Sequence, residues 1–136
     1  RNASVLWGLS KQKFIQNFPK TNIVITQGFI GSCDKNTTTL GREGSDYSAS
    51  IIGNLLDASE VILFKDVEGV YEKDPKISKN QNILPIPKLT YDQIKKYSNP
   101  ERPLVHNKTI QPLKEKNIIL KIRKFNDSDF QGTIIS

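Results

Sequence analysis

The sequence predicts an α/β domain with a mainly parallel sheet. Short β-branched segments alternate with longer segments of helical periodicity, and the first two of these strands are each followed by a glycine-containing loop. In such sheets the loops that leave the carboxyl ends of the strands form the ligand crevice. We therefore expect the two loops, residues 28–45 and 65–75, to lie side by side at one functional edge.

The first half of the chain is expected to contain a helix, a strand and a second helix. Residues 4–18 space their apolar side chains at helical intervals, and we expect Trp7 on this helix to lie in the core. Residues 22–27 (NIVITQ) are short and β-branched, which is typical of a buried strand. After the first loop, a Ser-Asp start and a one-sided apolar pattern predict a helix over residues 45–57.

The second half continues the alternation. Residues 60–64 (EVILF) predict a short apolar strand that precedes the second loop. Two shorter helices are expected near residues 90–97 and 108–116, and residues 118–122 close the pattern as a strand.

Composition limits the classes of protein. With 136 residues, 25% charged and 36% hydrophobic, the chain predicts one globular domain without a membrane span. Its single cysteine, Cys33, fits a reducing, cytoplasmic location. The net charge of +6 is spread along the chain, and the basic stretch 108–124 lacks interleaved aromatics, so we expect no nucleic-acid partner. Because the chain opens with Arg1 and contains no methionine, we expect it to be a piece of a longer protein.

The first loop, GFIGSCDKNTTTLGREGSD, has features that suit an anionic ligand. Glycines let backbone amides approach an anion, and the helix start that follows adds free N–H groups. Arg42 could hold a carboxylate through two parallel hydrogen bonds. An ordinary glycine- and threonine-rich connection is an equally good interpretation, and the loop does not match the phosphate-binding motif of P-loop enzymes.

The second loop, FKDVEGVYEKDP, places a carboxylate directly after a buried strand. Asp66 could accept hydrogen bonds from a sugar or orient a cation, Tyr71 could cover a flat ring, and Lys73 and Lys76 could meet phosphates. A turn stabilised by Asp66 explains the same pattern equally well.

Five segments in order resemble the aspartate kinases of the amino acid kinase superfamily. TTTLGREGSDYSA resembles the family's TTLGRGGSDYSA, and KDVEGVYEKDP resembles TDV-x-G-V-Y-x-x-DP. LTYDQI resembles LSYEEA, LVHNKTIQPL resembles VLHP-x-T-x-x-P, and FNDSDFQGT resembles the F-x-P-x-x-x-GT ending. The first of these motifs is much more specific to aspartate kinases than the second, which the wider superfamily shares.

The resemblance implies a three-layer αβα sandwich that transfers the γ-phosphoryl of MgATP to the β-carboxylate of L-aspartate, the first step toward lysine, threonine and methionine. It implies a cytoplasmic enzyme that uses ATP and Mg²⁺, and a homo-oligomer in the intact parent. By matching position it assigns the aspartate site to Arg42, Gly44 and Ser45, the catalytic centre to Asp46, and ATP binding to Lys65, Asp66, Tyr71 and Lys76.

Several positions depart from the family pattern. Glu43 stands where a glycine is usual, and Lys65 stands where a threonine is usual. In SNPERPLVH the usual lysine falls on Pro103, which leaves Arg102 as a neighbour of uncertain use and puts one phosphate contact in doubt.

The resemblance covers only part of such an enzyme. The amino-terminal K-F-G-G-T-S segment, with its lysine, and the regulatory ACT domains have no counterpart here. We therefore expect residues 1–136 to form the carboxyl-terminal, ATP-binding part of a catalytic domain, to need the amino-terminal lobe as a partner, and to be inactive alone.

The remaining candidate residues have simpler interpretations. Cys33 is expected to be a plain loop cysteine, His106 a packing and hydrogen-bonding residue, and Asp127 and Asp129 part of a solvated turn. Two other functions stay open: a superfamily kinase acting on glutamate, carbamate or UMP, and a non-catalytic basic binding module. Phosphorylation assays separate the first from an aspartate kinase, and steep salt dependence of DNA binding would favour the second.

Overall fold

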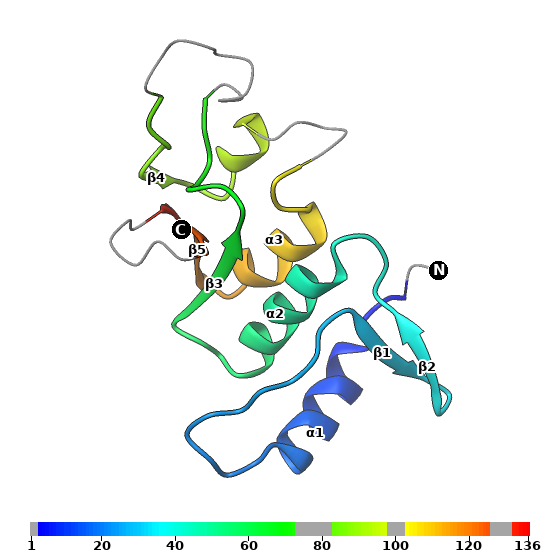
Figure 1. The fold of residues 1–136 in the computed structure, drawn as a ribbon. Helices are drawn as coiled ribbons and strands as arrows, with labels where there is room; N and C mark the ends of the chain where they lie inside the picture. The colour runs from blue at the N-terminus through cyan, green and yellow to red at the C-terminus, as the bar shows by residue number, and fades with distance from the viewer. Residues whose placement is uncertain (1–2, 73–82, 98–102, 126–131) are drawn as a thin grey trace.

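The computed structural model describes residues 3–72, 83–97, 103–125 and 132–136 (Figure 1). Its elements follow in chain order: α1 (Trp7–Asn17), β1 (Ile30–Cys33), β2 (Asn36–Thr39), α2 (Gly44–Leu55), β3 (Glu60–Lys65), β4 (Lys88–Leu89), the 3-10 helix η1 (Ile94–Tyr97), α3 (Asn107–Lys114), β5 (Ile119–Lys124) and β6 (Thr133–Ile135). The strands fall into a two-stranded sheet near the amino terminus and a four-stranded main sheet.

The main sheet has the strand order β3-β5-β6-β4. β3 and β5 run parallel, with Glu60 opposite Ile119 and Lys65 opposite Lys124. β4 and β6 are also parallel, whereas β5 and β6 are antiparallel. The predicted α/β class and the mainly parallel sheet are therefore confirmed. β4 and β6 were not predicted from the sequence.

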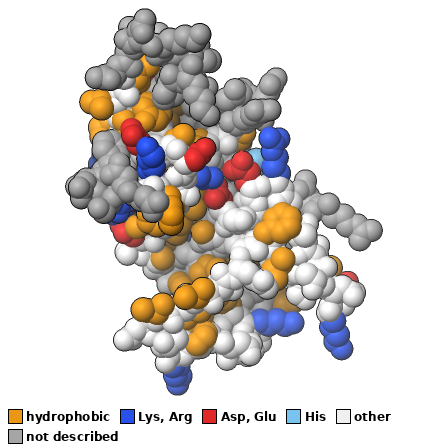
Figure 2. Space-filling view, viewed as in Figure 1, with side chains coloured by type: hydrophobic (Ala, Val, Ile, Leu, Met, Phe, Trp, Pro, Cys, Tyr) orange, Lys and Arg blue, Asp and Glu red, His pale blue; other side chains and the backbone are white. Residues whose placement is uncertain are grey.

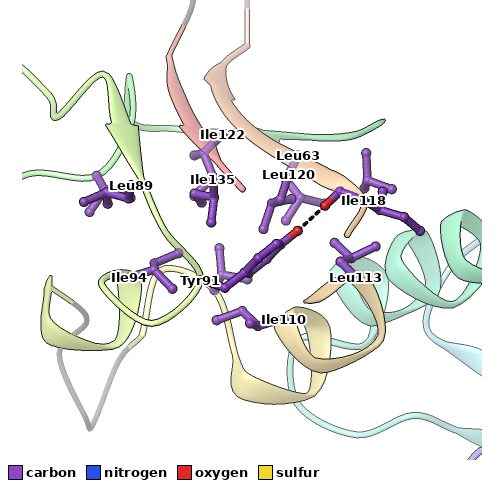
Figure 3. Packing of buried hydrophobic residues seen from close by; sticks show 13 residues of the cluster. Leu63, Leu89, Tyr91, Ile94, Ile110, Leu113, Ile118, Leu120, Ile122 and Ile135 are labelled. Carbon is purple, nitrogen blue, oxygen red and sulfur yellow. Dashed lines mark hydrogen bonds between the residues drawn. The ribbon is translucent and has the colours of Figure 1, made fainter. Parts of the chain in front are cut away.

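Helices α2 and α3 cover one face of this sheet (Figures 1 and 3). The close approach depends on Gly53, because a Cβ atom there would lie 2.4 Å from Val61 Cγ2. The hydrophobic core is formed by side chains from the sheet, from α3 and from the segments around Val70, η1 and Val105: Val61, Leu63, Val70, Leu89, Tyr91, Ile94, Val105, Ile110, Leu113, Ile118, Leu120, Ile122 and Ile135. On the opposite face Phe64 remains 56% exposed, so the described residues supply the sheet and one helical layer of the expected sandwich.

Buried polar contacts fix these layers relative to one another. Ser50 Oγ of α2 donates to the Thr109 carbonyl (2.6 Å), and Asn54 Nδ2 donates to the Pro112 carbonyl of α3 (2.7 Å). The Tyr91 hydroxyl donates to the Ile118 carbonyl at the start of β5, and this bond lies inside the apolar cluster (Figure 3). Buried polar groups that are paired in this way avoid a desolvation cost and define a single packing arrangement.

The predicted first loop contains a β-hairpin. β1 and β2 pair antiparallel, and their two connecting residues, Asp34 and Lys35, have φ values of 49° and 65°. Positive φ at both positions is the geometry of a type I′ turn, which matches the twist of the flanking strands. The consecutive threonines of β2 are β-branched and suit a strand.

Two predictions for the amino-terminal segment were wrong. Residues 22–27 form no strand, and Ile25 is 93% exposed. In the described part of the chain β3 pairs with β5, and the hairpin pairs with itself, so this segment has no partner strand. Trp7 is 36% exposed instead of lying in the core, because α1 buries none of its residues.

The other predicted elements are confirmed with adjusted ends. α1, α2, β3, α3 and β5 each lie within one to three residues of the predicted bounds. The helix expected near residues 90–97 is reduced to the single turn η1. It is preceded by a turn in which Thr90 N donates to Gln93 Oε1 (2.8 Å). In the described ranges, no helix has the length and apolar character needed to cross a membrane.

Candidate active site

An ion pair joins the carboxyl end of β3 to the first turn of α2. Lys65 Nζ contacts Asp46 Oδ2 in a short hydrogen bond, and both side chains are largely buried, with exposures of 19% and 16%. Figure 2 shows acidic and basic side chains close together in the upper middle of this face. The end of the first loop and the start of the second therefore meet, as the sequence predicted.

Glu43 adds a second carboxylate to this pair. Its Oε2 lies 3.9 Å from Lys65 Nζ, and that oxygen is buried without a hydrogen-bond partner among the described residues. Glu43 adopts φ 57°, a left-handed conformation that costs a residue with a Cβ roughly 1 kcal/mol. This conformation explains why glycine suits the position, and it shows that Glu43 is held in place despite local strain.

The hairpin is anchored on the amino-terminal end of α2. Phe29 N donates to Ser48 Oγ (2.8 Å), and Ser48 Oγ donates back to the Gly44 carbonyl (2.9 Å). A Cβ at Gly44 would lie 2.5 Å from Phe29 Cδ2, so glycine is required for this contact. Because Glu43 and Asp46 flank Gly44, the anchor also fixes where the two carboxylates lie.

Thr133 holds the second loop at its far end. The side chain is fully buried, and its Oγ1 accepts from Val70 N (2.8 Å) and donates to the Ile86 carbonyl (2.7 Å). Ile86 N in turn donates to the Val70 carbonyl (2.7 Å). Thr133, near the carboxyl terminus, therefore supports the loop between Lys65 and Tyr71, a role that sequence reasoning missed.

Tyr71 closes the described part of the second loop. Its hydroxyl donates to Glu68 Oε2 at 2.8 Å. Burial, together with this hydrogen bond and the Glu68 charge, raises the pKa of Tyr71 to about 12. The phenol is therefore neutral at physiological pH, and its ring is held by a contact on its polar end.

The remaining predicted site residues that the structure describes are sequence neighbours of Glu43, Asp46 or Lys65. Arg42, Ser45 and Asp66 are exposed, while Gly44 is buried. No contact between them and the ion pair is established, so their predicted roles stay predictions. Lys76, Lys73, Arg102, Asp127 and Asp129 lie outside the described residues.

Two residues behave as their simple interpretations predicted. His106 caps α3 by accepting from Lys108 N through Nδ1 (3.2 Å), and Cys33 is an exposed free thiol on the hairpin.

A cavity of about 390 Å³ lies between α1 and the ends of α2 and α3 and is lined partly by Trp7 and Lys116, away from the ion pair. Its lining contains Lys11, Glu115 and Lys116 but no residue of the two predicted loops, so we place the candidate site at the Lys65 cluster.

A mainly parallel α/β sheet with a charged cluster between a strand's carboxyl end and a helix's amino-terminal turn is typical of domains that bind anionic ligands. Comparison with known proteins agrees: the amino acid kinase family matches residues 1–124 of the chain. The chain belongs to the amino acid kinase family.

The relatives found in sequence are aspartokinases. A bifunctional aspartokinase/homoserine dehydrogenase from Buchnera aphidicola is 34% identical over 120 residues, covering 88% of this chain and 14% of that protein. The lysine-sensitive aspartokinase 3 of Escherichia coli is 33% identical over 130 residues, covering 93% of this chain and 28% of its own length. The chain thus spans less than a third of the length of these curated relatives.

Solved structures give the same result. Escherichia coli aspartokinase III in complex with aspartate and ADP has a TM-score of 0.85 at 30% identity, covering 98% of this chain and 30% of that one. The aspartate kinase of Clostridium acetobutylicum has a TM-score of 0.87 at 28% identity, with 98% and 30% coverage.

Proposed function

We propose that the chain is the carboxyl-terminal, ATP-binding part of an aspartate kinase catalytic domain. The observation that carries the proposal is the contact between Lys65 and Asp46, which brings together one residue from each of the two family-like loops. The relatives named aspartokinase support aspartate as the substrate, and the related structure with aspartate and ADP supports the pairing of acceptor and nucleotide at such a site.

The proposed reaction joins two anions. A β-carboxylate oxygen of L-aspartate forms a bond to the γ-phosphorus of ATP, the bond from that phosphorus to the β,γ-bridging oxygen breaks, and ADP leaves with that oxygen. Phosphoryl transfer needs alignment and positive charge more than covalent help from the protein. Arg42, Gly44 and Ser45 would hold aspartate, Asp46 would orient cationic groups around the phosphoryl, and Lys65, Asp66, Tyr71 and Lys76 would bind ATP.

The residues near the ion pair also fit the use of Mg²⁺. Within the described ranges no group of three or more histidine, cysteine or acidic side chains converges as a metal site. Magnesium in kinases is held by one or two carboxylates together with substrate phosphates. Asp46 and Asp66 are the carboxylates that would take part, and the bound ion would neutralise phosphate charge.

The amino-terminal segment supports the expectation of a further lobe. It exposes a set of large apolar side chains from the residue before α1 to the start of β1: Leu6, Leu9, Ile15, Ile23, Val24, Ile25, Phe29 and Ile30. Figure 2 shows hydrophobic side chains among uncharged ones on the lower part of this face. Such a surface is typical of an interface, and we propose that an amino-terminal lobe of the intact, cytoplasmic and homo-oligomeric enzyme covers it.

A substrate panel tests the proposal. The full-length protein that carries this chain should form an acyl phosphate from L-aspartate and MgATP, detected as the hydroxamate, while the 136-residue chain alone should give no turnover. Preference for glutamate, carbamate or UMP would assign a different member of the superfamily.

A further inference from the structure

The two departures from the usual family pattern contact each other in the structure. Glu43 stands in place of a glycine and Lys65 in place of a threonine, and their charged atoms lie 3.9 Å apart. They are separated in sequence by α2 and most of β3, so only the fold brings them together. A glycine and a threonine at these positions would carry no charge, whereas this chain has one negative and one positive side chain.

Lys65 is shared between two carboxylates. Its ammonium contacts Asp46 Oδ2 and lies near Glu43 Oε2, so the ionised cluster holds two negative charges and one positive charge. An ammonium has three N–H donors and can bind both carboxylates and one further oxygen. Asp46 Oδ2 takes one of these donors, whereas Glu43 Oε2 at 3.9 Å makes an ion pair without a hydrogen bond, so a donor remains for a ligand.

The environment of Glu43 indicates that its carboxylate serves this contact. Glu43 occupies the N-cap position of α2, but its side chain makes no capping hydrogen bond. Instead its buried Oε2 faces Lys65, with no hydrogen-bond partner among the described residues. A buried carboxylate is costly unless a cation balances it, and Lys65 supplies that cation.

We propose that Glu43 is a positioning residue for Lys65, and that the two form a matched pair at the phosphate end of the nucleotide site. Glu43 gives the ammonium a second anchor, so Lys65 stays at the site when it turns from Asp46 to a phosphate oxygen. Asp46 is then released toward the cationic groups around the transferred phosphoryl. This inference rests on the proposed function, because it requires that a nucleotide polyphosphate binds at this site.

The pairing predicts that the effects of substituting Glu43 and Lys65 on nucleotide affinity are not additive. Without Lys65, two carboxylates would face the incoming phosphates without a compensating cation, and like charges at this distance repel strongly in a partly buried site. Lys65→Thr alone should therefore weaken MgADP binding by more than about tenfold, which is the scale of one lost charge-assisted hydrogen bond. Adding Glu43→Gly removes one carboxylate and relieves the left-handed strain, so the double variant should bind MgADP clearly more tightly than Lys65→Thr alone.

The experiment is a double-mutant cycle on the full-length protein, with MgADP affinity measured by calorimetry and L-aspartate affinity measured in parallel. Glu43→Gly/Lys65→Thr is compared with each single variant, and thermal unfolding reports whether each is folded. A purely structural role would shift stability and both ligands, whereas the proposal predicts a selective change for the nucleotide. Should Lys65→Thr not fold, Lys65→Gln with Glu43→Gln repeats the cycle with side chains of nearly unchanged size.

A matched control uses the pair at the opposite end of β3. Lys121 Nζ lies 2.5 Å from Glu60 Oε2, and Lys121→Thr with Glu60→Gln should leave nucleotide affinity unchanged. Recovery in the Glu43/Lys65 double variant supports the proposal. A double variant as weak as Lys65→Thr alone, or equal losses for both ligands, overturns it. Wild-type MgADP binding without aspartate phosphorylation overturns only the proposed function, while no MgADP binding overturns both.

Discussion

The ammonium of Lys65, at the end of β3, contacts the carboxylate of Asp46 in the first turn of α2. This contact joins the two loops that the sequence marks as functional, so both face one edge of the sheet. The loops nevertheless carry different chemistry, since the first contributes an arginine beside a helix start and the second an aspartate after a strand. Substitutions in them are therefore expected to affect different substrates.

Asp66→Ala in the full-length protein should raise the apparent KM for ATP more than that for aspartate. The Asp66 carboxylate is exposed directly after β3, where it can accept hydrogen bonds from a nucleotide, and its loss should cost several-fold to about tenfold in affinity. Steady-state kinetics with each substrate varied in turn provide the measurement. Glu72→Ala, a few residues along the same loop, serves as the control, and an effect on aspartate alone would move Asp66 out of the nucleotide site.

Arg42→Ala should do the reverse. The exposed guanidinium just before α2 can hold the acceptor through charge-assisted bidentate hydrogen bonds, and losing them should cost roughly 2 kcal/mol, or about thirtyfold in affinity. Because lysine keeps the charge without the planar fork, Arg42→Lys should recover only part of the loss. If Arg42→Ala changed the KM for ATP and spared that for aspartate, the placement of the first loop would be wrong.

Thr133→Val should destabilise the protein and loosen the second loop. The substitution keeps the shape of the side chain but leaves Val70 N and the Ile86 carbonyl without the Thr133 hydroxyl, at a cost of about 1–3 kcal/mol for buried groups. Chemical denaturation gives the free energy of unfolding, and the KM for ATP reports the loop. Thr133→Ser retains the hydroxyl and should lie much closer to wild type; equal losses for both variants would show that the methyl group, not the hydrogen bonds, matters.

Tyr91 should make stability depend on pH in the alkaline range. Burial raises the pKa of Tyr91 to about 12, above its ordinary value of 10.0. The folded state therefore favours the neutral phenol, so this contribution is complete below pH 10 and is lost as pH rises toward 12. Tyr91→Phe should lower stability by about 1 kcal/mol at neutral pH through loss of the bond to Ile118, and should flatten the decline between pH 10 and 12.

The comparison is made by subtracting the free energies of unfolding of wild type and variant across that range, so that changes common to both proteins cancel. Tyr97→Phe on the neighbouring turn η1 removes a hydroxyl from the same region and serves as the control. If the stability of Tyr91→Phe fell between pH 10 and 12 as much as that of wild type, the loss could not be assigned to Tyr91.

Periodicity and local residue preferences predicted the elements that bury a face. α2, β3, α3 and β5 have apolar side chains on one side, and each contributes to one packed core. The same reasoning failed for residues 22–27, because β-branched composition predicts a strand only where a partner strand exists. It also missed the hairpin, whose turn has Lys35 in a left-handed conformation where glycine is usual after Asp34.

The candidate site was predictable in its residue types and not in its contacts. Motif resemblance selected Asp46 and Lys65 separately, one for catalysis and one for the nucleotide, but no local pattern indicated that they touch. Glu43 was noticed only as a departure from glycine, and its place beside Lys65 depends on tertiary structure. Thr133 was likewise part of a motif without a role, because its partners lie far away in sequence.

The most direct test of the account is transfer of labelled γ-phosphate from ATP to L-aspartate by the full-length protein. We predict an acyl phosphate on the β-carboxylate, identified by borohydride reduction to the corresponding alcohol. Formation should require aspartate, ATP and Mg²⁺, and Asp46→Asn should reduce it by about a hundredfold or more while the protein remains folded. Label transfer to glutamate or UMP in preference to aspartate, or undiminished transfer by Asp46→Asn, would contradict the account.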